Sequence, residues 1–98
     1  MDAVTAVSGS GPAYCFYLAE AMIEAAVNLG ISPENASEMA TATLKGAMIL
    51  LENQSISAQE LRQKVTSPGG TTEAAIKVLD DNDVKKIIIQ AVTAAAQR

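Results

Sequence analysis

An all-α fold of about five helices is predicted by three features of this 98-residue sequence. Apolar residues recur at helical spacing along most of the chain, which is typical of amphipathic helices. Gly-Pro, Ser-Pro and Ser-Ala-Gln-Glu segments supply helix start signals at intervals. No pair of alternating segments has the pattern of a strand hairpin. The length favours one domain over residues 1–98.

The first predicted helix runs from about Pro12 to Leu29, and Gly30 is the residue expected to end it. The segment 2–8 before it is small and alternating, and we interpret it as an extended entry segment. Most of this helix is apolar, and its polar positions form one narrow stripe of Glu20, Glu24 and Asn28. A helix that is apolar on most of its circumference is normally buried on most sides. One short chain can hardly provide that cover, so we expect a partner chain.

The second predicted helix begins after the N-cap Ser32, has Pro33 at its first position, and reaches about Glu52. Its polar face is expected to hold Glu34, Glu38, Thr41, Lys45 and Glu52. The opposite, apolar face is expected to hold Met39, Ala40, Ala47, Leu50 and Leu51. Gly46 in the middle costs about 1 kcal/mol relative to alanine, so we expect it to serve a close helix–helix approach.

Three shorter helices complete the prediction. A capping box at 57–60 opens the third, which ends near Val65, and the fourth follows the turn-rich segment 66–72 to about Asp80. Asp83 is expected in the first turn of the last helix, where its charge suits the helix dipole. The buried face of that helix is expected to hold Val84, Ile87, Ile88, Ala91 and Ala95.

Composition excludes several classes of function. The net charge of −4 and the scattered Lys and Arg residues argue against nucleic-acid binding. The chain has no histidine and a single cysteine, Cys15, which excludes an internal disulfide and a thiolate metal cluster. We expect Cys15 to be buried and structural. Short apolar stretches argue against a membrane span, and no signal peptide is visible, so a cytoplasmic location is expected.

Three other polar groupings have plain structural interpretations. Glu20 and Glu24 repel mildly as like charges four residues apart, and they fit a solvated stripe better than an acid/base pair. The acidic cluster at 80–83 lacks the ligand spacing of a calcium loop, so no metal site is expected. The segment 9–11, Gly-Ser-Gly, lacks the strand and the third glycine of a dinucleotide site, and we reject it as a cofactor motif.

The loop from Ser67 to Thr72 is the one candidate binding site. Gly69 and Gly70 let backbone N–H groups converge without obstruction, and the next helix points its N-terminus at the loop. Thr71 and Thr72 add hydroxyl groups at the same place. These features outline a site for a carboxylate or phosphate. A plain helix start behind a Pro-Gly turn explains the same residues, and on physical grounds alone this second interpretation is slightly ahead.

Two segments resemble those of a known family. Residues 6–14, Ala-Val-Ser-Gly-Ser-Gly-Pro-Ala-Tyr, resemble the segment that opens the C-terminal domain of pyrroline-5-carboxylate reductases. Residues 65–72, Val-Thr-Ser-Pro-Gly-Gly-Thr-Thr, resemble the signature of the same family. The two long helices between them, joined by the turn 30–33, also fit, so the resemblance covers essentially the whole chain.

The resemblance implies an enzyme that reduces 1-pyrroline-5-carboxylate to L-proline with NADPH or NADH. It implies that a Rossmann nucleotide-binding domain, absent from these 98 residues, holds most of the cofactor, so this chain alone would bind none and be inactive. It also implies an interlocked homodimer that can assemble into a ring. By similarity, Gly69, Gly70 and Thr71 offer N–H groups to the substrate carboxylate, Ser67 shapes the loop, and the catalytic Thr72 places its hydroxyl near the ring nitrogen.

Two other hypotheses belong to different classes. The chain could be a non-catalytic helical dimerisation module that binds no ligand. It could also be a phosphate-binding module that uses the same loop. The second is weakened because no Lys or Arg lies between Lys64 and Lys77, whereas phosphate sites usually recruit a nearby cation.

Overall fold

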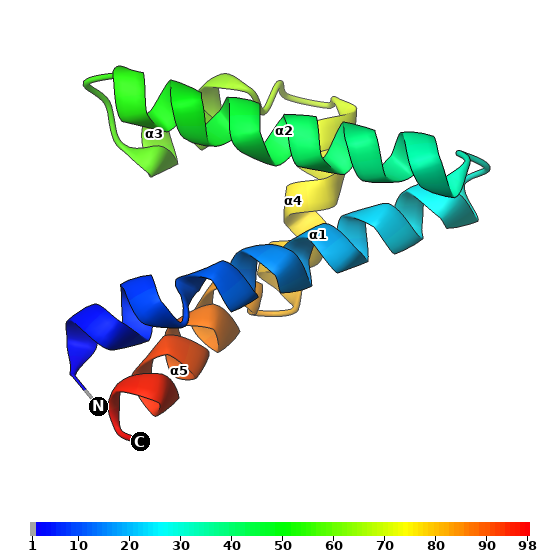
Figure 1. Cartoon of the computed structure of the whole chain (residues 1–98). Helices are drawn as coiled ribbons and strands as arrows, with labels where there is room; N and C mark the ends of the chain where they lie inside the picture. Colours follow the sequence, from blue (N-terminus) through cyan, green and yellow to red (C-terminus); the bar gives the residue numbers. More distant parts are fainter. Residues whose placement is uncertain (1) are drawn as a thin grey trace. The chain divides into compact units, whose positions relative to one another are not determined.

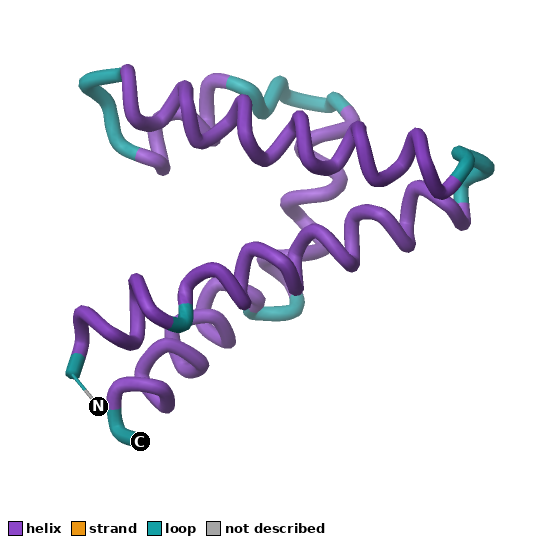
Figure 2. Tube along the Cα trace, in the orientation of Figure 1, coloured by secondary structure: helices purple, strands orange, loops and turns teal. Residues whose placement is uncertain are grey.

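The computed structural model describes residues 2–98 and contains only helices and loops over that range (Figures 1 and 2). The predicted all-α fold is therefore confirmed. The elements, in chain order, are the π-helix η1 (Thr5–Gly9) and the α-helices α1 (Gly11–Asn28), α2 (Pro33–Asn53), α3 (Ala58–Lys64), α4 (Thr71–Asp81) and α5 (Val84–Ala96). They form two compact units, one of residues 2–9 and 55–98 and the other of residues 10–54. No helix in the described range is long and apolar enough to cross a membrane.

The second unit is a hairpin of α1 and α2, and the turn between them is fixed by backbone hydrogen bonds. Gly30 lies just beyond α1 with φ +101°, a conformation that favours glycine. Its N–H donates to the Val27 carbonyl at 3.0 Å, and the Ile31 N–H donates to the Ala26 carbonyl at 3.0 Å. This paired arrangement satisfies the last carbonyls of the helix. The predicted end of the first helix at Gly30 is thus confirmed.

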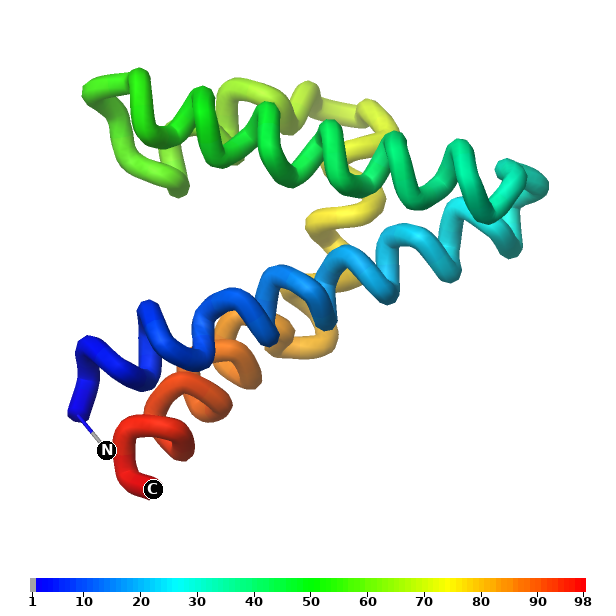
Figure 3. The backbone as a smooth tube through the Cα atoms, viewed as in Figure 1, coloured from blue at the N-terminus to red at the C-terminus, as the bar shows by residue number. Residues whose placement is uncertain are grey.

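In the hairpin, α1 and α2 converge on the turn that joins them (Figure 3), and the two buried side chains of this unit are both alanines. On α2, Ala36 and Ala40 are buried and Leu44 is half-buried, at a spacing of four residues. On α1 a set of half-buried side chains recurs at helical spacing and includes Ala19, Met22, Ile23 and Ala26. Alanine lets two backbones approach closely but removes little apolar area from water. The hairpin therefore has a thin core.

The apolar face predicted for α2 is only partly covered in the structure. Ala40 is buried, but Met39 and Leu50 are 53% and 52% exposed, so the actual contact stripe is rotated toward Ala36. A Cβ atom on Gly46 would meet nothing within 4 Å beyond the backbone of its own helix, so Gly46 serves no close approach within the described residues. The sequence pattern could not distinguish these faces because apolar residues occupy more of α2 than one neighbouring helix can cover.

The segment before α1 is helical, so the prediction of an extended entry segment over residues 2–8 is wrong. Side-chain bonds explain the difference. The Thr5 N–H donates to Asp2 Oδ1 at 2.8 Å, which caps the helical start, and Ser8 Oγ donates to the Val4 carbonyl at 2.8 Å. Short polar residues can support either an extended or a helical backbone, so their pattern alone does not decide. Ala6 is fully buried in η1, which contacts α5 in the same unit.

Acid is expected to loosen the start of η1. The Thr5 backbone N–H, followed by the Thr5 hydroxyl, lowers the pKa of Asp2 below its ordinary value of 3.8. A lowered folded-state pKa means that the carboxylate stabilises the fold above about pH 3.8, and that this contribution is lost as pH falls through the folded pKa. The Thr5 amide should then exchange faster with solvent at pH 2.5 than at pH 5, after correction for intrinsic rates. Equal protection of that amide in wild type and Asp2→Ala at pH 5 would contradict the prediction.

In the first unit, α3 begins as the sequence indicates. Ser57 Oγ accepts a hydrogen bond from the Glu60 N–H at 3.1 Å, which is one arm of the predicted capping box. In the other unit, Ser32 Oγ caps the start of α2 by accepting a hydrogen bond from the Asn35 N–H at 3.2 Å. These helix starts were predictable because each cap involves residues only three positions apart.

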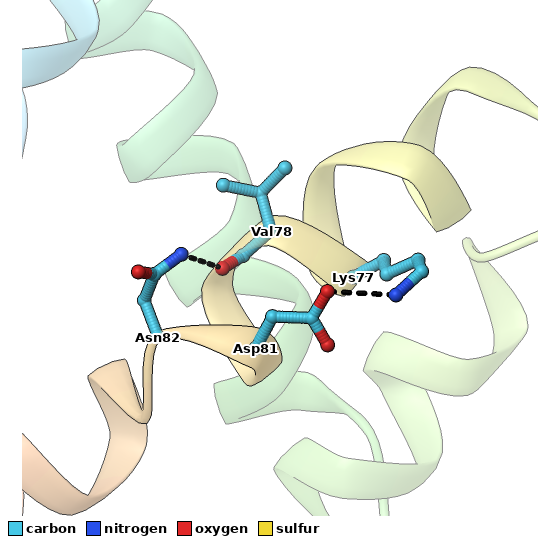
Figure 4. Close-up of polar contacts among 4 residues, drawn as sticks. All are labelled: Lys77, Val78, Asp81 and Asn82. Atoms are coloured by element: carbon cyan, nitrogen blue, oxygen red, sulfur yellow. Dashed lines mark hydrogen bonds and ion pairs between the residues drawn. The ribbon is translucent and has the colours of Figure 1, made fainter.

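The junction of α4 and α5 is held by local polar contacts (Figure 4). Lys77 Nζ lies 2.7 Å from Asp81 Oδ2, and the Asn82 side-chain amide donates to the Val78 carbonyl at 2.8 Å. Asp83 is the N-cap of α5, with φ 54°, and so precedes the helix rather than lying in its first turn. The backbone at Asp83 is left-handed, and Asp is among the non-glycine residues that tolerate this conformation.

The buried face predicted for α5 is not buried in the single chain. Ile87 and Ile88 are 55% and 54% exposed, and Val84 and Ala95 are only half-buried. The part of α5 that η1 and α4 contact is too small to cover this helix. Its three consecutive isoleucines, 87–89, are each more than half exposed, so they are available to another apolar surface.

The first helix also exposes much of its apolar surface. No side chain of α1 is buried, and Phe16, Tyr17 and Leu29 beyond its end are 68%, 70% and 84% exposed. Cys15 is exposed as well, so the prediction that it is buried is wrong for the single chain. These side chains are exposed because α1 is apolar on most sides and has only α2 beside it in its unit, as its sequence suggested.

Gly30→Ala is expected to destabilise the chain by about 1 kcal/mol, because alanine is disfavoured at a positive φ. Gly46→Ala is the matched control, with an expected stabilisation of about 1 kcal/mol from improved helix propensity if that position stays open. Urea unfolding followed by circular dichroism measures both free energies of unfolding. A Gly30→Ala chain as stable as wild type would contradict the turn assignment. Destabilisation by Gly46→Ala would show that a partner chain approaches there.

Candidate functional site

The candidate site is the loop 67–72 and the start of α4. Ser67 to Gly70 form a tight turn, in which the Gly70 N–H donates to the Ser67 carbonyl at 3.0 Å. Gly69 has φ +74° and follows Pro68, which matches a type II turn with proline at its second position and glycine at its third. The Pro-Gly pair therefore favours this turn through the preferences of its own backbone.

A side chain from α4 closes this turn. The Gly69 N–H donates to Glu73 Oε1 at 3.0 Å. Sequence reasoning treated Gly69 only as a donor to a ligand and did not assign a role to Glu73. A signal was present, because an acidic residue at the third position of a helix often bonds to a backbone N–H just before that helix.

The start of α4 carries amide groups without a side-chain cap. Gly70 is the N-cap and has no side chain to accept from them. The first turn of any α-helix leaves its N–H groups without intrahelical partners, and the helix dipole places partial positive charge there. In α4 these groups belong to Thr71, Thr72 and Glu73. The arrangement suits a small anion that accepts hydrogen bonds.

The residues predicted for the site lie together at this turn and differ in exposure. Ser67, Gly69 and Thr71 are exposed, whereas Gly70 and Thr72 are half-buried. A Cβ atom on Gly70 would lie 3.2 Å from the Ser67 carbonyl oxygen, so a side chain there would crowd the turn. Gly70 is therefore needed for close packing, since its φ of −87° is open to any residue.

The chain entering the loop is anchored on α3. Thr66 Oγ1 donates to the Arg62 carbonyl at 2.6 Å, and the Thr66 N–H donates to the Gln63 carbonyl at 3.2 Å. Thr66 is half-buried. Both bonds tie the loop to the last turn of a helix, so the position of Ser67 follows from that of α3. The turn is thus held at one end by α3 and at the other by Glu73 of α4.

The charges near the turn favour a carboxylate over a phosphate. The only charged side chain in 67–73 is the carboxylate of Glu73. The next cation along α4, Lys77, is already paired with Asp81. Within 67–73, positive potential therefore comes from backbone dipoles, whereas phosphate sites normally add a cationic side chain. No group of three His, Cys, Asp or Glu in the described residues could hold a metal ion.

The described residues do not fit a dinucleotide. A dinucleotide site normally places a glycine-rich turn between a strand and a helix. Here Gly9 ends a π-helix and Gly11 begins α1, and residues 2–98 include no strand. The segment 9–11 is thus a break between two helical elements. A nicotinamide cofactor would need a binding unit from outside these residues.

Comparison with known proteins places the chain in a family. Residues 1–98 match the family model described as pyrroline-5-carboxylate reductase dimerisation. The chain is 50% identical over all 98 residues to the pyrroline-5-carboxylate reductase of Pseudomonas aeruginosa, and covers 36% of that protein. It is 41% identical over its full length to pyrroline-5-carboxylate reductase 2 of Bacillus subtilis, and covers 35% of it. The chain therefore spans about a third of the length of these relatives.

Solved structures agree with the sequence comparison. The pyrroline carboxylate reductase of Plasmodium falciparum, solved with NADP bound, matches 99% of this chain with a TM-score of 0.95 at 35% identity, over 39% of its own length. The pyrroline-5-carboxylate reductase of Coxiella burnetii matches 98% of this chain with a TM-score of 0.93 at 47% identity, over 36% of its own length. The resemblance seen in the segments 6–14 and 65–72 is thus confirmed, and the chain belongs to the pyrroline-5-carboxylate reductase dimerisation family.

Proposed function

We propose that residues 1–98 are the dimerisation and substrate-binding domain of a cytoplasmic pyrroline-5-carboxylate reductase, which reduces 1-pyrroline-5-carboxylate to L-proline with NADPH or NADH. The observation that carries the proposal is the family match over all 98 residues. The relatives are roughly three times longer, which leaves room for a Rossmann nucleotide-binding domain in the complete protein. That domain would hold most of the cofactor.

The proposed substrate site is the turn and the start of α4. The substrate carboxylate would accept hydrogen bonds from backbone N–H groups at Gly69, Gly70 and Thr71, and Ser67 would shape the loop. The uncapped start of α4 supports this assignment, because its amides and dipole favour an anion. The N–H groups of Gly69 and Gly70 already bond to Glu73 and Ser67. The N–H groups of the first turn, from Thr71 onward, are therefore the ones that need no rearrangement to bind.

The proposed catalytic residue is Thr72, at the second position of α4. A substrate whose carboxylate sits on the first turn would hold its ring close to this half-buried residue. The Thr72 hydroxyl would donate a hydrogen bond toward the ring nitrogen, where a proton is gained as the C=N bond is reduced. A nicotinamide, when bound, supplies the hydride. The contribution of this chain is orientation of the imine, which is a large part of catalysis in such reactions.

The proposed partner is a second copy of this chain, and dimers could assemble further into a ring. The family is defined by dimerisation, and the exposed apolar side chains of α1 and α5 support the same assignment. Large exposed apolar patches on a small domain usually mark an interface. Burying them in an interlocked homodimer would supply the core that the single chain lacks.

The function is tested by exchanging this chain for the corresponding third of the Pseudomonas aeruginosa reductase, to which it is 50% identical. The chimera is expected to oxidise NADPH in the presence of pyrroline-5-carboxylate, whereas the 98-residue chain alone is expected to be inactive. Absorbance loss of NADPH measures both. Turnover by the chain alone would show that the cofactor site is misplaced. A folded, dimeric chimera without activity would favour a non-catalytic dimerisation module.

Within the same chimera, Thr72→Ala is expected to lower kcat about tenfold or more, because a positioned proton donor typically contributes about 10²–10⁴-fold and water can replace part of it. Thr72→Ser keeps the hydroxyl and should recover most of the rate. Thermal unfolding of the three proteins should be similar. Wild-type kcat in Thr72→Ala would remove this residue from the mechanism.

A further inference from the structure

Glu73 forms a side-chain hydrogen bond to the turn 67–70. The proposed substrate-binding roles do not explain this hydrogen bond. The Glu73 carboxylate accepts from the Gly69 N–H at 3.0 Å, across four residues. The residue that would normally cap this helix is Gly70, which has no side chain to do so. Glu73 therefore bonds to the residue before the N-cap, and leaves the amides of Thr71 and Thr72 without a side-chain cap.

We propose that Glu73 is a positioning residue for substrate binding: its carboxylate clamps Gly69 and so holds the turn in a conformation that keeps the α4 amides open to a carboxylate. In the clamped turn the Gly69 N–H stays bonded to Glu73, and the substrate carboxylate binds the N–H groups of the first turn of α4 instead. The inference rests on the proposed function and extends it to a residue that would not touch substrate. The clamp is useful because Gly69, at φ +74°, is followed by a second glycine, and such a pair has many accessible conformations without it.

The charge of Glu73 gives the clamp a second consequence. A carboxylate in the first turn of α4 competes with an incoming carboxylate for the same partial positive charge. Its bond to Gly69 commits Glu73 to the turn rather than to the amides of Thr71 and Thr72. Glutamine at 73 can accept the same bond without the charge, whereas alanine can accept none. Comparing the two variants therefore separates the effect of the hydrogen bond to Gly69 from the effect of the negative charge.

The kinetic test uses the active chimera with Glu73→Ala, Glu73→Gln and a control, Glu60→Ala. Glu60 is also exposed and also the third residue of its helix, α3, but its helix carries no predicted substrate contact. Glu73→Ala is expected to raise KM for pyrroline-5-carboxylate about five- to tenfold, the effect of losing one charge-assisted hydrogen bond. The values of kcat and of KM for NADPH should change less than about twofold, and Glu73→Gln should restore KM. An unchanged KM in Glu73→Ala, or no recovery in Glu73→Gln, overturns the inference.

A second measurement tests the inference without an assay of enzyme activity. In the 98-residue chain, hydrogen exchange followed by NMR reports protection of the Gly69 amide. Glu73→Ala should speed its exchange about fivefold or more, while Glu73→Gln and Glu60→Ala leave it near wild type. Equal Gly69 exchange in all four proteins overturns the clamp. An inactive wild-type chimera together with the expected exchange pattern would overturn the proposed function and leave the clamp supported, so the two failures are distinguishable.

Discussion

Gly70→Val is expected to lower kcat/KM for pyrroline-5-carboxylate about 100-fold in the chimeric enzyme, the loss that follows from displacing a bound substrate by about 1 Å. Even the first atom of a side chain at Gly70 would lie 3.2 Å from the Ser67 carbonyl oxygen and 3.6 Å from Ser67 Cβ. Valine adds two methyl groups beyond that atom. The turn must open to accept them, which moves the amides proposed to bind the carboxylate.

Steady-state kinetics at varied pyrroline-5-carboxylate measures this loss, and Gly30→Ala is the matched control. That variant strains a turn in the other unit, so it reports what general destabilisation does to activity. The Gly70→Val enzyme should lose far more activity than the control at equal helix content. Normal KM and kcat in Gly70→Val would show that the loop does not bind substrate.

Phe16→Asp is expected to convert the dimer to a monomer. Phe16 is 68% exposed in the single chain, so its replacement removes little from the fold of one copy. Burying a phenylalanine at an interface is worth about 1.5–3 kcal/mol, and a two-fold dimer loses the contribution of both copies. The dimer dissociation constant should therefore rise by about 10²–10⁴-fold, before the cost of burying the new carboxylate.

Light scattering after size exclusion gives the mass of each variant. Wild type should elute as a dimer or a multiple of it, relative to the 10.2 kDa of one chain. Glu24→Gln is the control, because this exposed residue lies on the polar stripe of the same helix and should leave the mass unchanged. Circular dichroism shows whether the helices persist. A stable wild-type monomer at micromolar concentration, or a Phe16→Asp dimer of wild-type strength, would contradict the proposed interface.

The ends of most helices were predictable because they depend on residues that are neighbours in sequence. Ser32 and Ser57 cap α2 and α3 as expected, and Gly30 ends α1 in a left-handed conformation. In each case a side chain or a glycine satisfies backbone groups within one turn of itself. The same reasoning predicted the turn-rich segment 66–72, in which Pro-Gly favours the tight turn at 67–70.

The start of the chain shows where local signals are insufficient. Residues 2–8 have small side chains that suit an extended or a helical backbone. The helical form carries the Asp2–Thr5 and Ser8–Val4 hydrogen bonds and buries Ala6 in η1, which contacts α5. That contact joins the first and last helical elements of the chain, so no local pattern could anticipate it.

The sequence by itself determined the five α-helices, most of their caps and the family, because these follow from local hydrogen bonding and from two distinctive segments. Only the tertiary structure decided which apolar faces are covered. Ala36 and Ala40 are buried while Met39, Ile87 and Cys15 are exposed, although all five sit at apolar positions. Periodicity shows that a face is apolar, but burial needs a neighbour with enough surface to cover it. The same is true of Glu73, whose role depends on the turn bringing the Gly69 N–H within 3.0 Å of its carboxylate.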